Sequence, residues 1–204
     1  MRRAGFANGT LVNLLSAAIF CVLLAHGSRW RADVRYFLVL ALAGNLFTGT
    51  GYFFFSGLSN FGDWAAVIRG LEPHWAWQLG LVVVGAASYW ASMLLVAAQL
   101  RPIRGEDRRR MRRLCWTPYF TDGALAGIAG LPNPAGLFYV IASALPSTLG
   151  ANAGLLSLPF MIDRRDHTET LVEPIRRSLP WIVAGAISSI LFIVVLGRGI
   201  TITR

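Results

Sequence analysis

The residue best placed to do chemistry in this sequence is an acid in an apolar setting. Asp122 lies in TPYFTDGALAGIAGLPNPAG (117–136), which also carries four glycines and three prolines. A carboxylate in a membrane-crossing segment is energetically expensive and is by default a functional-site hypothesis, here a metal ligand or a proton carrier. Two structural alternatives stand beside it. Asp122 lies near the cytoplasmic end of its span, within reach of headgroup water and Arg113, or it caps a helix together with Thr121.

Three further polar residues are candidates for lining a cavity. Asp63, in SNFGDWAAVI, suits a turn and is expected to cap a short amphipathic helix at the membrane interface. Asn45 lies within an apolar run, where an amide usually hydrogen-bonds across helices. Asn133 stands between two prolines in LPNPAG, where it either satisfies the carbonyls of a broken helix or faces a cavity.

The three histidines do not form a metal-binding pattern. His26 ends an apolar run, His74 sits among tryptophans, and His167 lies in a charged loop. None has a second histidine four residues later or a cysteine pair beside it, whereas zinc needs three or four converging ligands. We therefore expect no zinc site from these histidines alone.

Long apolar runs must position these residues. A bilayer crossing needs about 20 mostly apolar residues, and the chain offers such runs at 7–26, 35–57, 77–99 and 180–197. Residues 116–162 are long enough for two more, so we expect spans near 117–141 and 145–162 with a broken helix near 131–134. One crossing plus a re-entrant segment is the alternative. The prediction is a single all-α domain, 1–204, forming a multi-pass transmembrane helix bundle of about six spans.

Arginine counts predict the orientation of this bundle. The loops 27–35, 101–113 and 163–178 carry most of the arginines, and with six spans all three fall on one side, which the positive-inside rule makes cytoplasmic. Both termini and the loop 58–76 then lie outside. The MRR start opposes the rule on that side, and one additional upstream crossing would remove the conflict.

Composition excludes most soluble functions. Hydrophobic residues make up 55% of the chain, charged residues only 14%, and mean hydropathy is +0.54, whereas soluble domains average about 25% charged residues. The formal net charge of +9 comes from arginines in short loops. With no soluble domain to present them, we expect the lipid bilayer rather than nucleic acid as their partner. The cell membrane is the expected location.

Three segments, taken in order, resemble bacterial site-2-protease-like membrane zinc metallopeptidases. AGFANGTLVNLLSAAI is similar to the helix with an AGP-x-x-N-x-x-x-A pattern that follows the catalytic helix of that family. GNLFTGTGYFFFSGLSNFGDW resembles the next segment, with its GY and GDW elements. PYFTDGALAGIAGLPNPAG resembles the late broken helix whose Asp-Gly or Asn-Pro motif lines the metal.

The resemblance implies that Asp122, in Asp-Gly, is the family's late acidic zinc ligand. The family's other ligands and its general base come from an H-E-x-x-H helix, and this sequence contains none. The chain as it stands is therefore expected to hold no cofactor, with zinc present only if such a helix is supplied upstream. Three explanations stay open. The chain is a shortened product, a non-catalytic relative that binds a transmembrane helix of another protein, or an unrelated membrane protein such as a small transporter.

Overall fold

The computed structural model of the protein describes residues 8–27, 30–103, 108–132, 136–162 and 178–196, and every regular element within them is helical. In chain order the elements are α1 (Asn8–His26), α2 (Ala32–Ser59), α3 (Asp63–Ile68), α4 (His74–Leu100), η2 (Arg101–Ile103), α5 (Arg108–Gly130), α6 (Gly136–Tyr139), η3 (Val140–Ala144), η4 (Pro146–Gly150), η5 (Ala151–Ala153), α7 (Gly154–Met161), α8 (Leu179–Leu191) and η6 (Phe192–Leu196). The predicted all-α class is confirmed.

Three of these helices are long and apolar enough to cross a bilayer. They are α1, α2 and α4 with its continuation η2, and they match the predicted spans 7–26, 35–57 and 77–99. A shorter apolar helix covers Leu179–Val195. The described residues thus contain three candidate crossings, where the sequence predicted about six.

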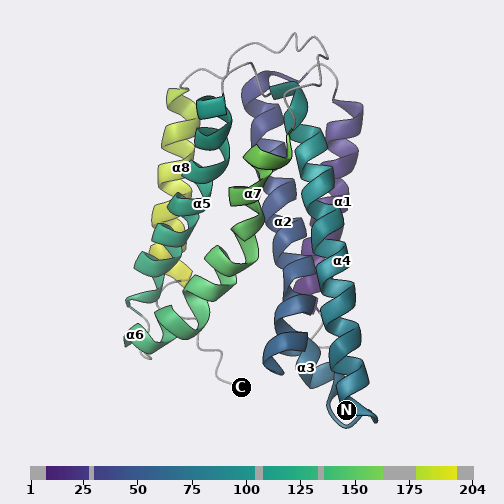
Figure 1. The fold of residues 1–204 in the computed structure, drawn as a ribbon. Coiled ribbons are helices and arrows are strands. Elements are labelled where there is room, and N and C mark those ends of the chain that lie inside the picture. Colours follow the sequence, from purple (N-terminus) through teal and green to yellow (C-terminus); the bar gives the residue numbers. More distant parts are fainter. Residues whose placement is uncertain (1–7, 28–29, 104–107, 133–135, 163–177, 197–204) are drawn as a thin grey trace.

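Helices α1, α2 and α4 pack side by side as one unit (Figure 1). Glycines set the closest approach between α2 and α4. A Cβ on Gly85 would lie 2.6 Å from the Cα of Phe54, and one on Gly57 would lie 2.8 Å from the backbone nitrogen of Val82. Because only hydrogen fits at these points, the two backbones come close together, as small residues allow in membrane helix pairs.

The short helix α3 lies at the end of this unit that is lower in Figure 1. Gly62, with φ of 91°, is its N-cap residue, and Asp63 lies in the first turn without a side-chain capping bond. The prediction that Asp63 caps this helix was therefore wrong by one residue. The hydroxyl of Tyr52 accepts the Asp63 N–H at 3.5 Å, and the acid suits the positive end of the helix dipole.

The remaining elements lie on the other flank of the molecule. Figure 1 shows α5 and α8 together on that flank, with α7 between them and the three-helix unit. Contacts of α7 with both α5 and α4 agree with this placement. The irregular elements η3, η4 and η5 lead from the end of the molecule near α6 back toward α7.

The predicted boundaries in this second half need correction. Helix α5 begins at Arg108, not at residue 117, because arginine is a good helix former and the helix continues beyond its apolar part. It ends at Gly130, followed by a turn at Leu131 and Pro132, where the break near 131–134 was expected. Residues 136–141, placed in the fourth span by sequence, instead begin the segment that returns to α7.

Candidate functional site

Asp122 lies well inside α5. Fourteen residues separate it from Arg108, which is roughly 21 Å along a helix at about 1.5 Å per residue. The prediction that it caps a helix was wrong, because the arginine-rich sequence before it is itself helical. Its partner is also not Arg113.

The carboxylate of Asp122 bonds to the side chain of Asn152 in η5. Asn152 Nδ2 donates to Asp122 Oδ2 at 2.9 Å, a hydrogen bond strengthened by the negative charge of its acceptor. Asp122 is half-buried and Asn152 is 9% exposed. The neighbouring Gly123 makes this contact possible. A Cβ there would lie 2.8 Å from Leu149 Cγ, so the missing side chain lets η4 lie against α5.

A tyrosine from α4 holds the irregular backbone that carries Asn152. The Tyr89 hydroxyl donates to the carbonyl of Ala151 at 2.7 Å and accepts the N–H of Gly154 at 2.7 Å. Irregular backbone at membrane depth persists only where protein or water satisfies it. A Cβ on Gly154 would lie 3.0 Å from both this hydroxyl and the Phe47 ring, which explains a glycine at this position.

A second tyrosine supplies the hydrogen bond that a proline removes from α5. Pro118 has no N–H, so it leaves the carbonyl of Leu114, four residues earlier, without its helical donor. The hydroxyl of Tyr36 on α2 donates to that carbonyl at 2.6 Å. The proline thus creates an acceptor through which α5 is attached to the three-helix unit.

The other predicted candidates do not gather around Asp122. Asn45 donates to the carbonyl of Ala41 on its own helix at 2.8 Å, not across helices. Asp63 lies in the turn beside Tyr52 at the α3 end. Asn133 lies outside the described residues. In the part of the chain that the structure describes, Asn152 is therefore the only residue to which Asp122 hydrogen-bonds.

The donor set does not fit a zinc ion. Across the described ranges, no three His, Cys, Asp or Glu side chains converge on one point. His26 Nδ1 lies 2.9 Å from the carbonyl of Val22, and His74 Nε2 lies 3.3 Å from Asn60 Oδ1. His167 falls outside the described residues. One carboxylate and one amide are fewer ligands than a zinc site requires.

The sequence interpretation missed the two tyrosines. Asn152 could be identified as a buried amide, but its contact with Asp122 could not. One signal for Tyr36 was available, since a proline inside a helix leaves an acceptor that needs a donor. Tyr89 carried no comparable signal, because its acceptor arises only where η4 and η5 depart from α-helical geometry.

Comparison with known proteins does not identify a family. No family model, no curated protein and no solved structure matches this chain.

Proposed function

We propose that this chain is a membrane-embedded relative of the site-2-protease-like metallopeptidases that does not hydrolyse peptides. The observation that carries the proposal is the Asp122–Asn152 contact deep within α5. It supports a role for the Asp-Gly dipeptide at a polar centre inside the bundle, where the resemblance expects the family's acidic ligand. The proposed partner is a transmembrane helix of another protein, bound without being cut.

The ligands available in the described residues support the proposed absence of hydrolysis. Asp122 and Asn152 offer one carboxylate and one neutral amide, and His26 and His74 have other contacts. A metallopeptidase activates its water with a metal held by three protein ligands, together with a general base. We derive no catalytic step through a metal from this donor set.

The experiment measures metal content and cleavage together. The full chain is purified in lipid nanodiscs, incubated with zinc and then desalted, and its bound zinc is measured by mass spectrometry of the elements. A membrane-protein substrate is added in parallel. We expect far less than one zinc per chain and no cleavage, with Asp122→Asn unchanged in both assays. Stoichiometric zinc with proteolysis that Asp122→Asn abolishes would overturn the proposal.

The proposed topology has about six crossings with the arginine-rich loops in the cytoplasm. One observation supports this topology. The junction from α1 to α2 and the starts of α5 and α8, which adjoin the three arginine-rich loops, lie at the same end of the molecule (upper in Figure 1). Single cysteines placed in residues 27–35 and 58–76 of a Cys21→Ser, Cys115→Ser background would test it. We expect an impermeant thiol reagent to label the second loop in intact cells and the first only after lysis.

A small transporter is the second candidate, and a specific observation favours it. Asn152 Oδ1 is buried without a hydrogen-bond partner in the described part of the chain, beside a half-buried carboxylate on irregular helices. Transporters place polar sites where helices are broken near the membrane centre. In proteoliposomes a transporter predicts ion or proton flux that Asp122→Asn abolishes, whereas the metallopeptidase relative predicts no flux from either chain.

A further inference from the structure

The first turns of α5 hold an arginine beside two aromatic rings, Trp116 and Phe160, whose centroids lie 6.5 Å apart. The Arg112 guanidinium carbon lies 5.6 Å from the ring centroid of Trp116, on the same helix, and 5.5 Å from that of Phe160 on α7. Trp116 is itself fixed, because its Nε1 donates to the carbonyl of Leu156 at 3.2 Å. These contacts hold the Arg112 side chain in place at the end of the bundle near the start of α5.

Contacts with ring faces leave the hydrogen-bonding capacity of Arg112 unused. A guanidinium carries five N–H donors in a planar fork that matches the oxygens of a phosphate. Within the described residues Arg112 makes no ion pair and donates no hydrogen bond, and its side chain is exposed. It is therefore an oriented cation whose donors are available to a ligand.

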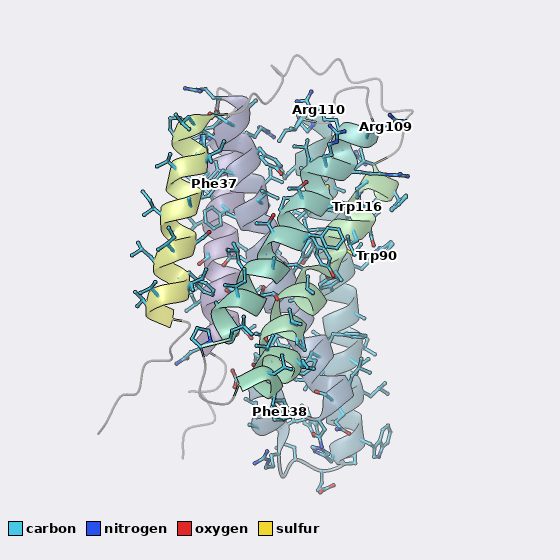
Figure 2. All side chains as sticks on the ribbon, turned by 90° about the vertical axis from the view of Figure 1, so that its left-hand side faces the viewer. Phe37, Trp90, Arg109, Arg110, Trp116 and Phe138 are labelled. Carbon is cyan, nitrogen blue, oxygen red and sulfur yellow. The ribbon has the colours of Figure 1, made fainter. Side chains whose placement is uncertain are left out.

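A second arginine and a row of aromatic rings share this face. Residues three and four apart are neighbours on a helix surface, which places Arg112 and Arg113 each next to Trp116, with Phe120 one turn further on. Figure 2 shows Trp116 below the arginine-bearing start of α5. Phe120 is 60% exposed and Phe160 66% exposed, so an apolar strip leads away from the cationic end.

Acidic side chains do not neutralise this cationic end in the described part of the chain. Asp33, a described acid at the same end, already contacts Arg31 at 3.1 Å and accepts from Trp181 at 3.1 Å. Asp63 and Glu72 lie at the other end, near α3. Residues 101–113 carry seven arginines against Glu106 and Asp107, so the net charge of this segment favours an anion.

We propose that Arg112 and Arg113, with Trp116, Phe120 and Phe160, bind one anionic phospholipid. The guanidinium groups hold the phosphate of the headgroup, and an acyl chain lies along the aromatic strip. The strip distinguishes a lipid from free phosphate, because only an amphiphile uses both parts of the face. This inference is independent of the proposed function and needs only that the protein resides in a membrane.

Binding is measured on the full chain purified in detergent. Phosphatidylglycerol, phosphatidylcholine and inorganic phosphate are the three probes, and native mass spectrometry counts the bound molecules. We expect one tightly bound phosphatidylglycerol, weaker phosphatidylcholine and no specific effect of inorganic phosphate. An arginine near anionic lipid contributes about 1 kcal/mol. Arg112→Gln should therefore weaken phosphatidylglycerol binding about fivefold, and the pair with Arg113→Gln should weaken it more.

Two controls separate a specific site from a generally basic surface. Arg31→Gln removes a charge at the same end but outside the proposed site, and it should leave binding within about twofold of the parent, well short of the loss expected for a contacting arginine. Phe160→Leu keeps every charge but removes one ring beside Arg112, and it should weaken binding. Circular dichroism checks that each variant is folded. Equal loss in all three arginine variants, equal affinity for phosphatidylcholine, or displacement of lipid by inorganic phosphate would each overturn the proposal.

Discussion

The two flanks of this molecule are held together in different ways. In the α1–α2–α4 unit the helices are regular, and glycine allows backbone to meet backbone, as at Gly85 and Phe54. In the α5–α7 region the backbone is irregular, and side chains complete its hydrogen bonds, as Tyr89 does for Ala151 and Gly154. Packing of the first flank depends on glycines that have no side chain, and packing of the second depends on particular hydrogen-bond donors and acceptors. Substitutions should therefore damage the two flanks differently.

The largest effect is expected at Gly85. In Gly85→Ala the added methyl group overlaps the backbone of Phe54, which cannot rotate away, so we expect a loss of about 3 kcal/mol, the upper part of the range for overpacked cores. Unfolding in mixed micelles with increasing denaturing detergent measures it. Gly80→Ala is the matched control. Nothing lies within 4 Å of its added methyl group, so it should be neutral or stabilising by up to about 1 kcal/mol. Equal stability of the two variants would contradict the packing described for α2 and α4.

The next effect is expected at Tyr89. Tyr89→Phe keeps the ring against Phe47 but leaves the Ala151 carbonyl and the Gly154 N–H without their shared partner, and we expect a loss of about 2 kcal/mol. Hydrogen exchange should locate the damage, with faster exchange at residues 151–154 and unchanged exchange in α1. Tyr52→Phe serves as a control at the α3 end. If hydrogen exchange rises equally along the whole chain, the Tyr89 hydroxyl does not stabilise the α5–α7 region in particular.

The Asp122–Asn152 contact should contribute less. Hydrogen bonds between membrane helices average about 0.6 kcal/mol and reach about 1.7 kcal/mol, and the charged acceptor places this one in the upper part of that range. A double-mutant cycle of Asp122→Ala and Asn152→Ala measures the coupling, because alanine at either position removes the hydrogen bond. Asn45→Ala in place of Asn152→Ala should show none, because Asn45 bonds to Ala41 on its own helix. A zero coupling for the first cycle would remove the polar centre on which the proposed function rests.

The smallest effect is expected at Tyr36, whose hydroxyl donates to the Leu114 carbonyl that Pro118 leaves without a helical donor. Tyr36→Phe removes the donor to Leu114 and should cost about 0.6 kcal/mol in the parent chain. In a Pro118→Ala background the helix supplies its own N–H to Leu114, so the same change should cost nearly nothing. Both numbers come from the micelle unfolding assay. An equal cost in the two backgrounds would show that the tyrosine acts through packing alone.

The same comparison shows what the sequence could predict. The spans of the regular flank follow from uninterrupted apolar runs, and 7–26, 35–57 and 77–99 agree with α1, α2 and α4 within three residues at either end. The predicted boundaries within 117–162 were wrong in detail. Hydropathy excludes the arginines before residue 117, but arginine favours a helix, so α5 begins at Arg108. Hydropathy locates what is buried in lipid, and it contains no information on where a helix ends in water.

The candidate site was predictable only in part. Asp122 could be selected because a buried acid is costly wherever it lies. Its partner could not, because Asn152 is reached only where Gly123 lets η4 approach and Tyr89 holds η5 in place. Such a contact depends on several distant residues at once. For Asn45 the sequence predicted a contact that does not form. Its amide was expected to hydrogen-bond across helices, but it donates to Ala41 on its own helix.

The order of these contacts along the chain has a consequence for biogenesis. Tyr36 precedes the carbonyl freed by Pro118, and Tyr89 precedes the backbone at Ala151 and Gly154. A ribosome delivers the N-terminal part of a chain first. Each of these backbone groups therefore leaves the ribosome after the side chain that bonds to it. In a bilayer the irregular helices would then not face lipid alone, because the earlier part of the chain would already be present to complete their hydrogen bonds.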